Sequence, residues 1–467
     1  MISFLPKQIS SRAIYLYLGS LAAVSIVFRS HAMQPVFILL GIMWVVGFFL
    51  LVSHFSQRWR KLEQPALHWT LFLTALGLRW AWVVFSFFFY MAKTGAPFEF
   101  SAADSLAYWD ESLWLSQSKW ATIRDYLFTS RNTVSDSGYL LYLTYLCKVI
   151  GTGIVSVRLF NAILSAASVL LVYHLAKRNI GEEGGRMAAV MTCFMPNLIY
   201  YCGLHLKETV MIFLIVAFLE RTDYLIRAKR YNVLTIAVPV LLLLSLFTFR
   251  TVLGITGAFA LATGLLFTNQ RIIGRTKRIL LIVWGVLAVT YLWGGTIRAE
   301  VESTWDDREM NQETKRQSQT QRGNQWAKYA TGTVMAPLMF ILPFPTMVDV
   351  DEQYNQQVIS GGNYVRTFLG GFVLLALFST IFVKKNWREL SFLGSFVIGY
   401  LGILSASGFS NSERFLLPAL PGLLIMASYG ITVLDAKNYR FIKIWYYVVP
   451  VMIVGWAFFK LGSRGIL

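Results

Sequence analysis

Apolar runs of membrane-spanning length recur along the whole chain, and they constrain its fold more than any other feature. A helix needs about 20 apolar residues to cross a hydrocarbon core of about 30 Å, and runs of this kind alternate here with polar loops. Only 14% of the 467 residues are charged and 56% are hydrophobic, whereas soluble domains carry about 25% charged residues. We therefore predict an all-α polytopic membrane protein.

The apolar runs define thirteen candidate spans, which are 13–28, 34–53, 67–91, 153–176, 187–204, 208–226, 232–249, 251–269, 279–297, 364–383, 390–408, 414–434 and 443–460. With thirteen crossings, alternate loops share a side, and basic residues occupy every second loop. These basic positions are Lys7, Arg12, 58–61, 177–186, 227–230, 271–278, 384–388 and 437–443. By the positive-inside rule, this side and the N-terminus are cytoplasmic. The first helix lacks a small-residue cleavage site, so we expect it to stay uncleaved.

Two long segments fall on the outer side, 92–136 and 298–363. The apolar run 138–150 is too short to span, so we expect it to form a helix in the outer interface. Segment 298–363 begins with a charged, polar run, which is typical of a chain that is mobile without ligand. It is also long enough to close over a bound substrate and exclude water.

The net charge of +18 does not indicate nucleic-acid binding, because the basic residues lie mainly in the loops that set topology. The three cysteines, Cys147, Cys193 and Cys202, lie in apolar segments without metal-ligand spacing, which indicates core positions. A divalent ion held by Asp104 with Asp349 or Asp351 is conceivable, but no motif supports it. We therefore predict no firm cofactor.

The first candidate site is the acidic stretch "AADSLAYWDES" at 102–112, which directly follows a long apolar run. As a helix, it places Asp104, Tyr108 and Glu111 within about 60° of one another, while Asp110 points away. Two interpretations stay open. The stretch is either a solvated amphipathic helix or the carrier of a general base at the mouth of a helix bundle.

A second candidate site consists of basic residues expected near outer turns. They are Arg158, Lys207, Arg250, Arg366 and Arg414, and His205, Glu208 and Glu413 lie beside them in the sequence. Each cation alone fits a membrane anchor, but five together could converge on an anionic headgroup. Arg79 differs, because it falls near the middle of a span and must face the bundle interior or a wet cavity. For Arg79, an ion pair and a catalytic role both stay open.

Three segments in a fixed order resemble one family: "DSLAYW", "VRLFNAILSAASVLLVYHLAKRNIGEEGGRMAAVMTCFMPNLIYYCGLHLKE" and "ERFLLPALPGLLIMASYGI". Together they resemble the GT-C superfamily of membrane glycosyltransferases, on the branch of the protein O-mannosyltransferases and aminoarabinose transferases (glycosyltransferase family 39). The resemblance covers 67–297 well and 364–434 more loosely. It implies a GT-C catalytic core at 67–297 with its outer loop 92–136. Two extra helices at 1–66 precede the core, and the outer loop 298–363 and the helices 364–467 follow it.

The resemblance also implies an activity. Such enzymes move a sugar from a polyprenyl-phosphate donor to a lipid, glycan or protein outside the bacterial cytoplasmic membrane, as in polysaccharide biosynthesis for the cell envelope. Asp104 and Tyr108 match the family's essential outer-loop aspartate and its following aromatic. The family often has an adjacent acidic pair there, and the adjacent pair in this chain is Asp110–Glu111, so two positions stay open for the base. Lys207, Glu208 and Arg414 match charged positions of relatives.

The implied reaction inverts the configuration at the anomeric carbon of the sugar, and Asp104 acts as the base. Arg414, together with Lys207 or Arg250, stabilises the leaving phosphate. This hypothesis predicts that Asp104 and Arg414 lie within about 10–15 Å of each other, beside a lipid-open groove. A lipid-linked polysaccharide polymerase or a flippase-like transporter is the alternative. A transporter should instead place charged residues near the bilayer midplane on broken helices.

Overall fold

The computed structural model describes residues 4–127, 135–228, 232–267, 344–350, 353–383, 387–407, 413–435 and 438–462. The predicted span 279–297 and most of the outer loop 298–363, including Asp351, lie outside these residues. Within them the chain is helical, without a β-strand, and its one β-bridge joins Ala32 and Val348. The predicted all-α fold is confirmed for this part of the chain.

Residues 4–267 contain eleven of the α-helices in the described residues. They are α1 (Lys7–Val27), α2 (Pro35–Arg58), α3 (Gln64–Thr94), α4 (Ala103–Gln117), α5 (Trp120–Asp125), α6 (Ser137–Ile150), α7 (Ile154–Phe194), α8 (Pro196–Tyr200), α9 (Glu208–Arg227), α10 (Val233–Phe249) and α11 (Thr251–Phe267). After the gap come α15 (Tyr354–Val358), α16 (Ser360–Phe378), α17 (Ser391–Ser407), α18 (Glu413–Leu416), α19 (Leu420–Thr432) and α20 (Tyr439–Gly462). Short 3₁₀ turns and one π turn connect several of them.

Seven helices of the described chain are long and apolar enough to cross a membrane, and α10, α11 and α17 are shorter apolar helices. The chain is thus a polytopic membrane protein. The predicted spans 153–176 and 187–204 appear as one long helix, α7, which breaks at Gly181, followed by α8. Gly181 has φ of 85°, a left-handed conformation that is open to glycine without steric cost, so the chain reverses there.

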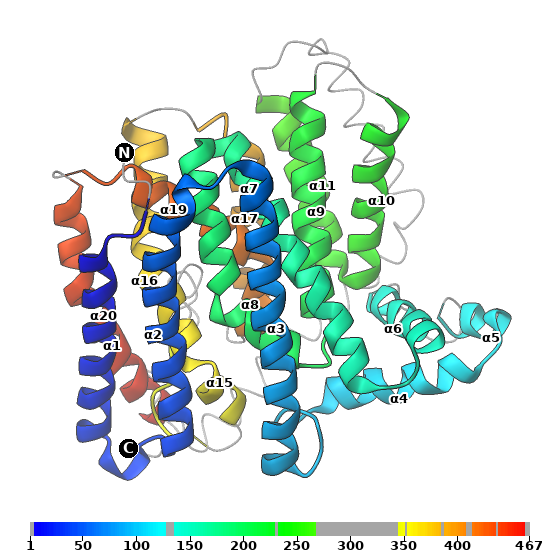
Figure 1. Ribbon diagram of the computed structural model, residues 1–467, viewed down its shortest axis with the longest axis horizontal. Coiled ribbons are helices and arrows are strands. Elements are labelled where there is room, and N and C mark those ends of the chain that lie inside the picture. Colours follow the sequence, from blue (N-terminus) through cyan, green and yellow to red (C-terminus); the bar gives the residue numbers. More distant parts are fainter. Residues whose placement is uncertain are drawn as a thin grey trace.

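Figure 1 shows the long helices standing side by side, with α4, α5 and α6 extending sideways at the lower end of the bundle. The bend of α7 lies at the upper end. There, Arg186 donates hydrogen bonds to the carbonyls of Trp59, Arg60 and Leu62, and Arg227 donates to the carbonyl of Glu389. The basic loops around these residues therefore gather at one end of the bundle, as expected from basic residues in every second loop.

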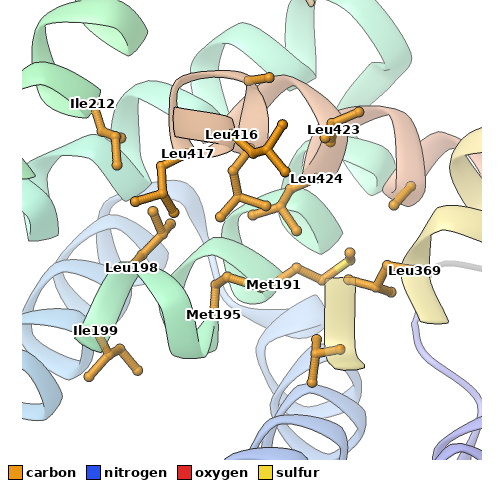
Figure 2. Close-up of a cluster of buried hydrophobic side chains, with 14 of the residues drawn as sticks. Met191, Met195, Leu198, Ile199, Ile212, Leu369, Leu416, Leu417, Leu423 and Leu424 are labelled. Carbon is orange, nitrogen blue, oxygen red and sulfur yellow. The ribbon is translucent and has the colours of Figure 1, made fainter. Parts of the chain in front are cut away.

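A buried apolar cluster joins α18 and α19 to α7 and α8. Figure 2 shows Leu416 and Leu417 near Met195 and Leu198, and both leucines are buried. Burying a leucine side chain contributes about 1.5–3 kcal/mol, so this cluster fixes the place of the short helix α18. On α19, a Cβ at Gly430 would collide with the carbonyl of Phe372 on α16. Close packing of α16 and α19 therefore requires glycine at this position.

Arg79 lies inside the bundle and has no solvent exposure. Its guanidinium donates to the Ser165 hydroxyl at 2.8 Å and to the carbonyls of Ala75, Cys193 and Thr192 at 3.1–3.3 Å. Pro196 has no N–H, so the carbonyl of Thr192 lacks its usual helical donor, and Arg79 supplies one. The sequence left an ion pair and a catalytic role open for Arg79. The partners in these contacts are instead a hydroxyl group and backbone carbonyls, which indicate a structural role.

We predict that Arg79→Met lowers stability by about 2 kcal/mol or more, because it leaves buried carbonyls without a donor. The melting temperature in detergent should fall by several degrees, whereas Met at the exposed Arg60 should leave it unchanged. Equal melting temperatures for the two variants would contradict this structural role.

Candidate functional site

The candidate site forms where α4, α9 and α18 meet at the end of the bundle opposite the α7 bend. Asp104 stands in the first turn of α4 and Glu208 in the first turn of α9, and carboxylates are stabilised at helix N-termini. Arg414 lies on α18, held in place by the apolar cluster that buries Leu416. The three side chains come from segments far apart in the sequence.

Arg414 joins the two carboxylates. Its Nη2 donates to Asp104 Oδ2 at 2.7 Å, and its Nε lies 3.1 Å from Glu208 Oε1. Glu208 is almost fully buried, with 1% of its side chain exposed, whereas 52% of the Asp104 side chain is exposed. A buried carboxylate requires a charged or hydrogen-bonding partner. Glu208 thus anchors Arg414, and Asp104 takes the outward end of the guanidinium.

Arg250 lies against the same aromatic ring as Arg414, and Lys207 precedes Glu208 in the chain. The guanidinium carbons of Arg250 and Arg414 lie 4.6 and 5.3 Å from the centre of the Phe415 ring. Arg250 also donates to the Tyr400 hydroxyl at 3.4 Å. Lys207 forms an ion pair with Asp136 and lies 3.5 Å from the Phe249 carbonyl.

Like charges this close repel one another, and an anion between them would relieve the repulsion. Burial lowers the pKa of Lys207, Asp136 opposes this shift, and the positive charge of Arg250 adds to it. Arg414 and Lys207 already pair with carboxylates, so an anion bound here would compete with Asp104 for Arg414 and with Asp136 for Lys207.

The other two predicted cations point elsewhere. Arg158 is fully buried and donates to the Pro97 carbonyl at 2.7 Å. Arg366 is also buried, on α16, and Glu413 is the nearest negative charge acting on it. Neither takes part in the group around Phe415. Of the five cations expected near outer turns, Arg250 and Arg414 lie at the Phe415 ring, and Lys207 pairs with Asp136.

The predicted acidic helix is present as α4. Tyr108 is buried and packs edge-on against Tyr139 of α6, with ring centres 5.0 Å apart. Its place is therefore in the packing of α4 on α6, and burial raises its pKa. Asp110 is exposed and Glu111 half-buried on the same helix. Asp104 is the carboxylate of α4 that the described contacts join to a cation of the second candidate site.

Sequence reasoning missed several polar residues of this region. Glu99 is 7% exposed and accepts a hydrogen bond from Ser105 at 2.5 Å, and burial raises its pKa. Asp136 pairs with Lys207, and Asn363 donates to Glu413. The carboxylate of Glu99, five residues before Asp104, was a visible signal. The pairings of Asp136 and Asn363 depend on tertiary contacts and left no pattern in the sequence.

Among the residues that the structure describes, no group of three or more His, Cys, Asp or Glu could hold a metal ion. Asp349, proposed as a partner of Asp104 for a divalent ion, accepts a hydrogen bond from Gln357 at 2.9 Å. Its backbone N–H donates to the carbonyl of His31. The three cysteines are buried and free, as predicted.

No family model matches the sequence, and no curated protein is similar to it. Among solved structures, the chain is similar to the Archaeoglobus fulgidus oligosaccharyltransferase, in a complex with Zn and sulfate. The match covers 72% of this chain and 44% of that chain, with 14% sequence identity and a TM-score of 0.39. The chain thus corresponds to less than half of that protein's length.

His205 lies between helices in the turn that precedes α9, fully buried, with its ring 5.2 Å from that of Trp109. Burial lowers its pKa from 6.5 to about 3, and the charge of Arg158 adds to this shift. The folded protein therefore keeps this imidazole neutral, while the unfolded chain takes up a proton below about pH 6.5. Stability from this group is present at neutral pH and is lost as the pH falls towards 3.

We predict that His205→Gln makes the melting temperature less dependent on pH between about 6.5 and 4.5, whatever its effect at neutral pH. Thermal melts of purified protein across this range measure the slope. His54→Gln, at an exposed position, serves as the control and should keep the wild-type slope. Identical slopes for wild type and His205→Gln would contradict the assignment.

Proposed function

We propose that the chain is a membrane glycosyltransferase that moves a sugar from a polyprenyl-phosphate donor to an acceptor hydroxyl. The observation that carries the proposal is the junction of an exposed carboxylate with a group of cations. Asp104 is bonded to Arg414, and Arg414 shares the Phe415 ring with Arg250. A base and an anion site in direct contact are what transfer of a phosphate-linked sugar requires.

In the proposed reaction, the donor phosphate takes the outward nitrogens of Arg414 and the guanidinium of Arg250. Asp104, released from Arg414, accepts the proton of the acceptor hydroxyl. The hydroxyl oxygen forms a bond to the anomeric carbon from the face opposite the phosphate. The bond between that carbon and the phosphate oxygen breaks, the configuration inverts, and the polyprenyl phosphate leaves with the bonding electrons. The growing charge on this phosphate is what the cations stabilise.

An apolar pocket supports a prenyl chain as part of the donor. A cavity of about 580 Å³ lies among α11, α16, α17 and α19. Gly399 of α17, the residue before Tyr400, and Phe259 of α11 line it towards the site, and Phe267 and Ile180 line it towards the α7 bend. Arg250 immediately precedes α11, so the same two helices present Tyr400 and Arg250 and border the pocket. A headgroup at Arg250 and a hydrocarbon chain along these helices would suit one amphipathic ligand.

We further propose that the site faces outward from the bacterial cytoplasmic membrane and that the N-terminus is cytoplasmic. The support is the charge pattern, since the basic loops gather at the end of the bundle that carries the α7 bend, away from Asp104. The acceptor is a lipid, a glycan or a protein of the cell envelope that offers a hydroxyl group.

A lipid-linked polysaccharide polymerase or a transporter is the second candidate. One observation favours a transporter, because Arg79 bonds to carbonyls beside the helix break at Pro196, and broken helices carry charges in transporters. The full burial of Arg79 and its neutral partners favour a structural role instead. Asp104 separates the two functions, since the transferase would depend on its carboxylate and a transporter would not.

We predict that Asp104→Asn removes one sugar from a defined glycan, because loss of a general base costs about 10²–10⁴ in rate. A deletion strain would carry wild type, Asp104→Asn or the matched control Asp110→Asn at equal expression. Mass spectrometry of lipid-linked and surface glycans is the measurement. Wild-type glycans from Asp104→Asn would contradict the assignment of Asp104 as the general base. Loss with Asp110→Asn alone would move the role to that residue.

Arg414→Gln should lower transfer by about 10²–10³, since it removes a donor to the leaving phosphate. Arg366→Gln is the matched control for a buried outer arginine that lies apart from Phe415, and it should retain more transfer at equal expression. The same glycan profiles measure both variants. A larger loss for Arg366→Gln than for Arg414→Gln would place the phosphate at Arg366.

A further inference from the structure

A buried segment crosses the end of the bundle that holds the site. We call residues 344–350 and 353–358 the strap. Val348 pairs with Ala32, and Lys460 of α20 donates to the side-chain oxygens of Gln353 and Gln356 at 2.6 and 2.7 Å. Val348 and Val358 have no solvent exposure. The strap is therefore anchored to the α1–α2 connection and to the last helix.

The strap holds the chain segment that leads into α4. Asn355 Nδ2 donates to the Phe100 carbonyl at 2.6 Å, and the Tyr354 ring lies 5.2 Å from the Phe100 ring. Phe100 precedes Asp104 by four residues, and Glu99 is bonded to Ser105. The start of α4, and with it Asp104, is thus fixed on one side by Asn355.

Beyond the strap, the first turn of α16 holds the residue next to Arg414. Asn363 Nδ2 donates to Glu413 Oε2, and Asn363 accepts a hydrogen bond from Asn197 at 3.0 Å. Glu413 immediately precedes Arg414 on the four-residue helix α18. One continuous stretch, 353–363, therefore contacts both chain segments that carry the Asp104–Arg414 pair.

We infer that Asn355 and Asn363 are positioning residues that set the geometry of Asp104 and Arg414 for the transfer reaction. Each amide bonds to a neighbour of one member of the pair, eight residues apart on one buried stretch. The inference rests on the proposed function. Displacing a reacting group by 1 Å costs about 100-fold in rate, so loosening one anchor should lower transfer by about 10-fold or more.

The first test measures the mobility of α4 and requires no substrate. In a background with the three cysteines replaced by alanine, Ala107→Cys at an exposed position of α4 carries a nitroxide spin label, while Asp104 and Arg414 stay native. Asn355→Ala and the near-isosteric Asn355→Asp, which cannot donate to the Phe100 carbonyl, should shorten the rotational correlation time of the label at least threefold. Gln353→Ala is the matched control, because it removes one hydrogen bond from the strap to α20 without touching either segment.

The second test measures transfer in cells by the glycan profile, with native Asp104 and Arg414. Asn355→Ala should lower transfer by about 10-fold while Gln353→Ala stays within about twofold. Wild-type label mobility or wild-type transfer in Asn355→Ala overturns the inference, as does an equal change in Gln353→Ala. Wild-type glycans from Asp104→Asn overturn the proposed function itself, so the two failures are distinguishable.

Discussion

The buried carboxylate of Glu208 is the constraint on which the site depends. A carboxylate with 1% exposure is costly without a cationic partner, and Arg414 is the cation that reaches it. The need to neutralise Glu208 fixes the Nε side of the guanidinium, so its outward nitrogens face Asp104. The leucines that follow Arg414 bury α18 in the apolar cluster. The position of this arginine is therefore determined by packing and by electrostatics acting together.

The anion site follows from the same arrangement. Arg250 and Arg414 both lie against the Phe415 ring, and its attraction for each cation offsets part of their mutual repulsion. Tyr400 ties this group to α17 through its hydrogen bonds with Arg250 and the Phe415 carbonyl. Cations held in advance by protein contacts need little reorganisation when negative charge develops on a leaving group. The cost of assembling them is met during folding.

The sequence predicted an all-α membrane protein, because membrane-length apolar runs are strong local signals. Of its thirteen spans, 187–204 forms the second arm of α7 with α8, and α9 at 208–226 is not among the described helices that are long and apolar enough to cross a membrane. The sequence also predicted that Asp104 and Arg414 lie close together, although the direct ion pair is shorter than the separation expected for a bound sugar phosphate. It did not predict the burial of Arg158 and Arg366 or the pairing of Lys207 with Asp136. Those depend on how helices distant in the sequence pack, and helical periodicity carries no information about that.

The ion pair between Asp104 and Arg414 has a consequence for the order of events in the proposed reaction. In the pair, Asp104 Oδ2 accepts a hydrogen bond from Nη2 of Arg414, so this oxygen is already engaged. A donor phosphate competes for the same guanidinium, and its binding frees Asp104 Oδ2 to accept a hydrogen bond from the acceptor hydroxyl. The donor thus prepares the base that its own acceptor requires. Binding the acceptor first would meet a carboxylate still held by Arg414, so productive transfer favours the donor entering before the acceptor.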